Sequence, residues 1–123
     1  MKGIFWNARG IGKDPKKRFV REMIMEHNLD FVGILETIKQ NFTKGELHNL
    51  CNGKNYEWKW NPPRGLSGGI LVGVNRDHFD VILAKQEEYF LSVMVYDKNA
   101  KFHWNLIAVY GDAQPEKKSW FFG

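Results

Sequence analysis

The sequence predicts an α+β fold, an α/β sandwich in which a β-sheet is flanked by one or two helices. The chain has 123 residues, which suits one globular domain and is too short for two ordinary ones. Residues 3–37 read as a strand, an amphipathic helix and a second, buried strand, which is a βαβ-like beginning. Two long β-rich runs follow at 88–96 and 101–110. Early strand–helix alternation followed by paired strands is typical of a mixed fold.

The first strand and the first helix are expected within residues 3–28. The run Gly3–Ala8 is short and aromatic, and the loop 9–12 that ends it contains two glycines, which favour a sharp turn. Asp14 is a preferred N-cap residue, and Pro15 suits the first helical position. The apolar residues that follow recur at helical spacing, with basic residues on the outward face. Asn28 is expected to close this helix.

Three further strands and a loop are expected in the middle of the chain. The strand 30–37 is expected to be buried, because five of its first six residues are apolar or glycine. Residues 56–60 alternate like a strand, and 61–65 read as a loop. Residues 67–74 are expected to form a short buried strand that begins with two glycines.

The last third of the chain is expected to contain a hairpin and a helix. The turn between the strands 88–96 and 101–110 is placed at 97–100, since its Asp and Asn tolerate tight-turn geometry. Residues 115–122 read as the first two turns of an amphipathic helix. That helix would stop where its apolar face begins, and this pattern predicts that the domain is incomplete.

Composition and charge exclude several classes of protein. The 43% of hydrophobic residues is too high for a disordered chain. No run approaches the roughly 18 apolar residues of a membrane span, and no secretory signal is present, so no membrane partner is expected. The single cysteine, Cys51, excludes an internal disulfide framework and a Cys-rich zinc site. The net charge of +4, densest at residues 13–21, is compatible with a polyanionic partner.

Three polar residues fall at expected strand ends, where the active sites of α/β proteins commonly lie. Glu36 supplies a carboxylate that can hold Mg²⁺, and the alternative is a solvated glutamate paired with Lys39. Asn7 would emerge beside Glu36 if the first two strands are neighbours, and the alternative is a residue that only starts a loop. Tyr110 ends the last strand, and its hydroxyl would either donate to a phosphate or lie in water.

An aromatic and basic cluster occupies residues 56–64. Aromatic faces next to cations are what base stacking and phosphate contact use. The alternative is that the two tryptophans, which share one face of a strand, contribute to the core. The residues predicted here to contact nucleic acid are Trp58, Lys59, Trp60 and Arg64.

Four short motifs then stand in order along the chain, each at an expected strand end: Trp6–Gly10 (W-N-A-R-G), Ile34–Lys39 (I-L-E-T-I-K), Ser67–Ile70 (S-G-G-I) and Val109–Gly111 (V-Y-G). Together they resemble successive motifs of the endonuclease/exonuclease/phosphatase superfamily. The forms W-N-x-R-G, L-x-E-T-K and S-G-G are most similar to the apurinic-type endonuclease domain of non-LTR (LINE-type) retrotransposons, which are abundant in plants.

The resemblance implies a two-layer β-sandwich flanked by helices, the four-layer fold of that superfamily, and Mg²⁺-dependent hydrolysis of phosphodiester bonds in DNA. It implies that Glu36 is a Mg²⁺ ligand, that Asn7 lies in the active site and that Tyr110 contacts the scissile phosphate. Arg9 and Lys39, which stand within the first two motifs, are predicted to contact the nucleic acid. A nuclear or cytoplasmic location is what the family implies.

The chain also departs from the family pattern. The later G-D-F-N and S-D-H motifs of the superfamily are absent, and Gly111-Asp112 is followed by Ala113-Gln114. We therefore expect residues 1–123 to be the N-terminal half of such a domain, with one metal ligand and no nuclease activity of its own. The alternatives are a small non-catalytic nucleic-acid-binding module and a product that rarely folds.

Overall fold

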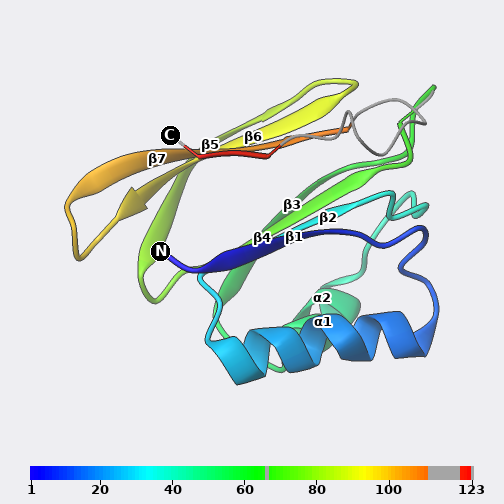
Figure 1. Ribbon diagram of the computed structural model, residues 1–123, viewed down its shortest axis with the longest axis horizontal. Helices are drawn as coiled ribbons and strands as arrows, with labels where there is room; N and C mark the ends of the chain where they lie inside the picture. The colour runs from blue at the N-terminus through cyan, green and yellow to red at the C-terminus, as the bar shows by residue number, and fades with distance from the viewer. Residues whose placement is uncertain (66, 111–119, 123) are drawn as a thin grey trace.

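The computed structural model describes residues 1–65, 67–110 and 120–122, and only the backbone of the last three. The described elements form two sheets and two helices (Figure 1). The elements are β1 (Gly3–Asn7), α1 (Asp14–His27), β2 (Phe31–Leu35), α2 (Lys44–Leu50), β3 (Tyr56–Asn61), β4 (Ile70–Asn75), β5 (Phe79–Gln86), β6 (Phe90–Asp97), β7 (Phe102–Val109) and β8 (Trp120–Phe122).

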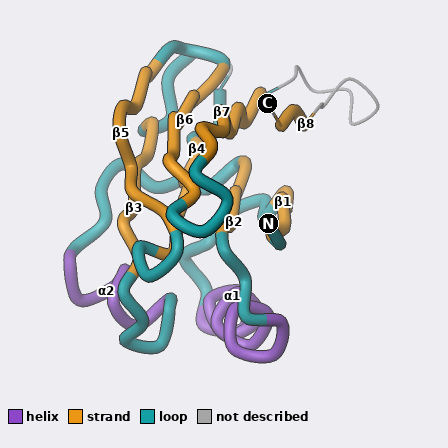
Figure 2. Tube along the Cα trace, turned by 90° about the vertical axis from the view of Figure 1, so that its left-hand side faces the viewer, coloured by secondary structure: helices purple, strands orange, loops and turns teal. Residues whose placement is uncertain are grey.

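The two sheets stack face to face, and the helices cover the outer face of the first sheet. The strand order is β1-β2-β4-β3 in the first sheet and β5-β6-β7-β8 in the second. Strands β1 and β2 are parallel and are joined through α1, as the sequence predicts, whereas the other strand pairs are antiparallel. Figure 2 shows α1 and α2 together on one side of the first sheet. The predicted α+β sandwich is confirmed.

Helix α1 forms and ends where the sequence predicts, but its N-cap is one residue earlier than predicted. The sequence favours Asp14 as the N-cap, but the N-cap is Lys13, without a side-chain cap bond, and Asp14 is the first helical residue. A carboxylate in the first turn still favours the positive end of the helix dipole. Pro15 lies in the first turn, as predicted, and Asn28 closes the helix in the left-handed conformation with φ +48°.

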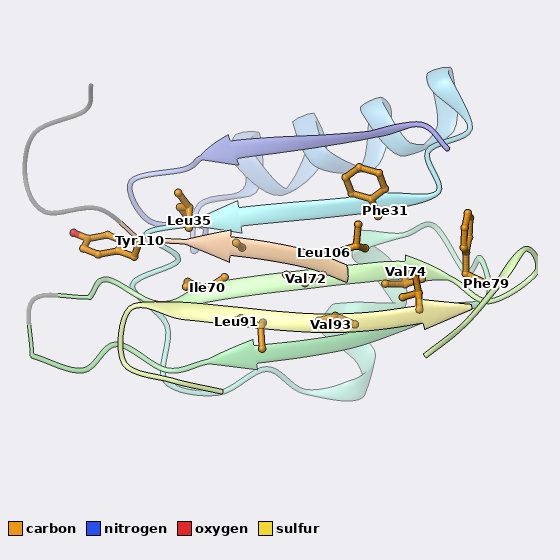
Figure 3. Packing of buried hydrophobic residues seen from close by; sticks show 12 residues of the cluster. Phe31, Leu35, Ile70, Val72, Val74, Phe79, Leu91, Val93, Leu106 and Tyr110 are labelled. Atoms are coloured by element: carbon orange, nitrogen blue, oxygen red, sulfur yellow. The ribbon is translucent and has the colours of Figure 1, made fainter. Parts of the chain in front are cut away.

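Strands β2 and β4 are buried on both faces, and this explains their nearly continuous apolar sequences. Alternate residues of each strand enter two different cores. Leu35 and Val72 face the second sheet, where they belong to the same core as Leu91 of β6 (Figure 3). Toward the helices lie residues such as Ile34 and Leu71. The first sheet is therefore the central layer of the molecule.

In three cross-strand pairs of the first sheet an aromatic ring lies over a glycine. A Cβ on the glycine would come within about 2.4 Å of the partner's ring in each pair, so the ring occupies the space that a side chain would need. The pairs are Gly3 with Phe31, Phe5 with Gly33, and Trp58 with Gly73. This cross-strand packing is specific to the register and helps to define it.

The sequence pattern does not predict two of the elements, α2 and β5. Helix α2 has seven residues, and its N-cap Thr43 forms a capping box with Glu46. So short a helix shows too few turns for a periodic pattern. In β5, an irregularity between Val81 and Leu83 shifts the register and breaks the alternation of apolar and polar residues.

The C-terminal helix expected at 115–122 is wrong at residues 120–122. These residues form β8, which pairs antiparallel with β7. Residues 115–119 lie outside the described part of the chain. The predicted hairpin of β6 and β7 is confirmed, because Lys101 N donates to Asp97 O at 2.7 Å across the turn. None of the described helices has the length and apolar character needed to cross a bilayer.

Candidate active site

The ends of six strands meet at one edge of the sandwich. In the first sheet, Asn7 pairs with Leu35, Leu35 with Ile70, and Ile70 with Asn61. The Asn61 side-chain amide nitrogen then donates to two carbonyl oxygens of the β5–β6 hairpin: Glu87 O, just after β5, at 2.7 Å and Phe90 O, at the start of β6, at 2.9 Å. Phe90 pairs with Val109 in the second sheet. The loops that carry all four sequence motifs therefore leave the sheets at the same edge.

At this edge the structure joins Glu36 and Tyr110. The Tyr110 hydroxyl donates to Glu36 Oε1 at 3.1 Å, although the two residues are 74 positions apart. Tyr110 is only 9% exposed, and its ring belongs to the core between the sheets. Figure 3 shows it at the end of that core toward which β1 and β2 run, beside Leu35 and Ile70. The Tyr110 hydroxyl, which follows β7 of the second sheet, therefore binds the Glu36 carboxylate, which follows β2 of the first sheet.

The backbone of residues 36–38 is held in an uncommon conformation. Glu36 has φ +54° and Ile38 has φ +52°, values that non-glycine residues rarely adopt. Hydrogen bonds hold the segment from both sides: Gly10 N donates to Glu36 O at 2.6 Å, and Ile38 N donates to Gly68 O at 2.8 Å. Such strain costs of order 1–3 kcal/mol per residue and is found preferentially at functional sites. The loops after β1 and before β4 thus determine where the Glu36 carboxylate lies.

The two glycines of the S-G-G motif allow these loops to approach one another. A Cβ on Gly68 would lie 3.2 Å from Glu36 Cα, and a Cβ on Gly69 would lie 2.4 Å from Thr37 Oγ1. Gly69 also has φ +97°, where an L side chain is strained. The two glycines therefore pack closely against the segment that carries Glu36.

Asn7 lies at the end of β1, next to the Glu36 strand as predicted. Its register partner is Leu35, whose side chain enters the core between the sheets, so Asn7 is on that same face. Its Oδ1 is buried and has no hydrogen-bond partner among the described residues. A buried acceptor without a donor is costly, and a cation or a donor from a ligand would satisfy it.

These residues fit a hard cation. Mg²⁺ takes oxygen ligands, uses one or two carboxylates and keeps several waters. Glu36 offers a carboxylate, and Asn7 offers the unpartnered Oδ1 at the neighbouring strand end. Within the described residues there is no cluster of three His, Cys, Asp or Glu side chains that would enclose a metal completely. The arrangement suits a cation that shares its coordination with water and with a phosphate.

Arg9 and Lys39 lie next to this edge in different settings. Arg9 is exposed in the loop after β1, and its carbonyl oxygen accepts a hydrogen bond from Lys16 Nζ at 3.0 Å. Lys39 lies 3.0 Å from Glu46 of α2 and 5.5 Å from the centre of the Phe42 ring. The hydrogen bond from Lys39 lowers the pKa of Glu46. Lys39 is thus held by α2, whereas the Arg9 side chain is exposed to solvent.

The aromatic and basic cluster is divided by the structure. Trp58 stacks on Tyr56 with ring centres 5.5 Å apart, and Trp60 meets Phe42 edge-on at 5.5 Å. Both tryptophans pack against the core beneath the helices, which favours the core interpretation. Lys59 lies 3.4 Å from Glu57. Arg64 is exposed in the loop after β3, close to Asn61 at the edge that carries Glu36.

Sequence reasoning missed two residues that build this edge. Asn61 joins the two sheets through the hydrogen bonds described above. Thr37 is buried, with 1% of its surface exposed, and it packs against Gly69. Asn61 stands beside Pro62-Pro63 in what reads as a loop. Nothing local distinguishes it from an ordinary turn asparagine, because its acceptors lie 26 and 29 residues later in the chain.

No protein-family model matches the chain, and no curated protein matches it in sequence. Several solved structures match in fold. A D. rerio TDP2 crystal structure complexed with single-strand DNA product is 11% identical, with a TM-score of 0.63, over 95% of this chain and 49% of that one. The AP endonuclease LMAP from Leishmania major is 17% identical, with a TM-score of 0.59, over 89% of this chain and 39% of that one.

A third similar structure is ANGEL2, a 2′,3′-cyclic phosphatase, in complex with adenosine-2′,3′-vanadate. It is 10% identical, with a TM-score of 0.58, over 79% of this chain and 37% of that one. The chain thus spans about half the length of the TDP2 chain and less of the other two. The chain therefore shares its fold with parts of these three structures.

Proposed function

We propose that this chain is part of a metal-dependent phosphodiesterase domain that acts on DNA, in the manner of an apurinic-type endonuclease. The observation that carries the proposal is the hydrogen bond of 3.1 Å between Tyr110 and Glu36. It brings together two of the three residues that the motifs single out, one directly after β2 of the first sheet and one directly after β7 of the second. The third, Asn7, lies on the adjacent strand with an unpartnered oxygen. Single-strand DNA in a TDP2 structure and the activity named for LMAP support DNA as the partner.

Each residue has a role that follows from its chemistry. Glu36 and Asn7 would hold a divalent cation through their oxygen atoms, with Mg²⁺ as the expected ion. Such a cation stabilises the negative charge that develops on a phosphate during hydrolysis. Tyr110 orients the Glu36 carboxylate, and its hydroxyl is close enough to that carboxylate to donate to a bound phosphate instead. Arg9 and Arg64 are both exposed next to this edge, and they would contribute cations to the DNA backbone there.

The origin of the chain belongs to the same proposal. The W-N-A-R-G, L-E-T and S-G-G strings support descent from the endonuclease domain of a non-LTR retrotransposon. The chain contains neither G-D-F-N nor S-D-H, the motifs that supply the remaining catalytic groups in that superfamily. We therefore expect residues 1–123 alone to bind the cation weakly and to leave DNA uncut, because a water without a positioned base reacts slowly.

The test is divalent-cation binding followed by a nicking assay. Calorimetric titration with Mg²⁺ should show weak binding that Glu36→Gln abolishes. Glu26→Gln, at an exposed position in α1, is the matched control and should bind like the unaltered chain. Equal binding by both variants would refute the metal assignment.

In the nicking assay, supercoiled plasmid should stay intact when the chain and Mg²⁺ are present. Nicking that disappears in Glu36→Gln would refute the expectation that residues 1–123 are inactive, and it would support the assignment of the site to Glu36.

The second candidate is nucleic-acid binding without catalysis. It is favoured by the basic residues of the segment 13–21, which lie on α1 and its N-cap. A DNA affinity that falls steeply with salt and is the same with and without Mg²⁺ would support it. An affinity that requires Mg²⁺ and Glu36 would favour the phosphodiesterase.

A further inference from the structure

A cavity of about 360 Å³ lies between the two helices, separate from the edge that carries Glu36. Its cationic wall comes from the N-terminal half of α1, and its opposite wall comes from α2. The lining includes Lys17, Arg18, Arg21, Glu46, Asn49 and Leu50. Three cations on one helix facing a polar hollow are the usual setting for an anion.

Arg21 is oriented for such a ligand. Its Nε donates to Asn49 O at 2.8 Å, which ties α1 to α2 and fixes the plane of the guanidinium group. The other guanidinium N–H groups remain as donors in a rigid fork that suits phosphate oxygens. Lys17 stands one helical turn before Arg21 on the same face, and its side chain has no hydrogen bond or ion pair with the described residues.

The acidic residues of the cavity are partly compensated. Glu46 is bound by Lys39 at 3.0 Å and accepts from Thr43 N at 3.2 Å, so its charge is already matched. Asp14, which also lines the cavity, lies one turn before Lys17 and Arg18 and offsets one of these cations. Arg18 lies 4.0 Å from Glu22 in an exposed pair that contributes little. A surplus of positive charge therefore faces the cavity.

The cavity is connected to the candidate site through α1. Lys16 Nζ donates to Ala8 O at 2.6 Å and to Arg9 O at 3.0 Å, so the first turn of α1 lies against the loop that follows β1. In Figure 1 the start of α1 lies at the same end of the molecule as the end of β1. A nucleic-acid strand that is bound at Glu36 and passes Arg9 would next meet the start of α1.

We infer that the cavity between α1 and α2 binds a backbone phosphate of a nucleic-acid strand, beyond the phosphate at Glu36 and Tyr110. This inference rests on the proposed function for the identity of the partner. A phosphodiester group matches the cavity in charge, and the guanidinium fork of Arg21 matches it in shape. Phosphate contacts of this kind position a strand without reading its sequence.

The test compares two charge-neutralising variants that should both fold. Lys17→Gln/Arg18→Gln removes two cavity cations and leaves the Arg21–Asn49 hydrogen bond in place. Lys2→Gln, at the opposite end of β1 from Asn7, is the control for charge removed elsewhere. Affinity for a single-stranded oligonucleotide is measured by fluorescence anisotropy between about 50 and 200 mM salt.

We expect the cavity variant to bind about tenfold more weakly at low salt, with a salt slope smaller by about 0.7 for each phosphate that the variant no longer neutralises. Lys2→Gln should change affinity by less than about twofold, because an exposed charge away from the ligand acts only at long range. Titration of the unaltered chain with inorganic phosphate should also shift the Arg21 Nε–H resonance in an NMR spectrum.

Equal affinities of the cavity variant and Lys2→Gln, or an unmoved Arg21 resonance, would overturn the inference. The proposed function fails in a different way. If Glu36→Gln leaves Mg²⁺ binding unchanged while the cavity variant weakens the oligonucleotide, the phosphate site stands and the metal site falls. If no oligonucleotide binds at low salt, both the cavity and the nucleic-acid partner are refuted.

Discussion

Replacement of Gly69 by alanine tests whether the segment that carries Glu36 is held as the structure shows. Gly69 has φ +97°, and a Cβ there would lie 2.4 Å from Thr37 Oγ1 and 3.3 Å from Asn61 O. Placing an L residue at such a φ costs about 1–2 kcal/mol. Thr37 is 1% exposed, so its hydroxyl has no room to retreat, and overpacking of this kind costs typically about 1–3 kcal/mol.

A smaller effect opposes these two. Alanine restricts the unfolded chain more than glycine does, and this stabilises the folded state by about 0.4–1 kcal/mol. We therefore expect Gly69→Ala to lower the free energy of unfolding by roughly 1–5 kcal/mol. For a domain with a stability of about 5–15 kcal/mol, that is a large fraction, and it lowers the melting temperature by roughly 10 °C.

Urea denaturation followed by tryptophan fluorescence measures this difference, and the matched control is Gly12→Ala. A Cβ on Gly12 would meet nothing within 4 Å, and its φ lies outside the left-handed range. The same chemical change should therefore leave stability unchanged or raise it by up to about 1 kcal/mol. A loss below about 0.5 kcal/mol in Gly69→Ala, or equal losses at both positions, would show that the loops around Glu36 are not packed as described.

Three other variants or conditions probe the same structure. Asn61→Ala removes the side-chain donor that links the first sheet to Glu87 O and Phe90 O, of which Phe90 O keeps the donor Glu87 N. The variant should cost about 1–3 kcal/mol and accelerate amide exchange around residue 90, and exchange like that of the unaltered chain would contradict the link. Tyr110→Phe keeps the ring in the core and removes the hydroxyl that donates to Glu36, so it should cost about 1 kcal/mol and weaken Mg²⁺ binding. An unchanged Mg²⁺ affinity would show that the hydroxyl does not orient the carboxylate. Burial raises the pKa of the Cys51 thiol and of the Tyr56 phenol. The folded chain therefore keeps protons that the unfolded chain releases above about pH 9, and the free energy of unfolding should fall as the pH rises past that value, with a shallower fall in Tyr56→Phe.

The fold was largely predictable where a local pattern is strong. Continuous apolar residues predict β2 and β4, because both faces of these strands are buried. Helical spacing of apolar residues, with Pro15 near its start, predicts α1. The pattern failed where an element is short or irregular, as in α2 and β5, and at Trp120–Phe122, where pairing with β7 produces a strand in place of the expected helix.

The site was predictable in its residues and not in its geometry. Glu36, Asn7 and Tyr110 stand out because polar side chains follow strands that are otherwise apolar. Their grouping depends on the pairing of β1 with β2 and on the stacking of the two sheets, which no local pattern encodes. At the cluster predicted at residues 56–64, the sequence pattern suggested a binding surface that the structure assigns in part to the core. Trp58 and Trp60 alternate with Lys59 as a binding surface would, yet they pack beneath the helices.

The sequence by itself determined the elements with clear periodicity, the charge of the chain and the identity of the strand-end residues, because these depend on neighbours a few positions apart. Only the tertiary structure decided that a hydroxyl 74 positions later reaches Glu36. It also decided that Glu36 and Ile38 adopt positive φ. The reason is the same in both cases: contacts between distant loops supply the free energy that holds a conformation which the local sequence would not choose.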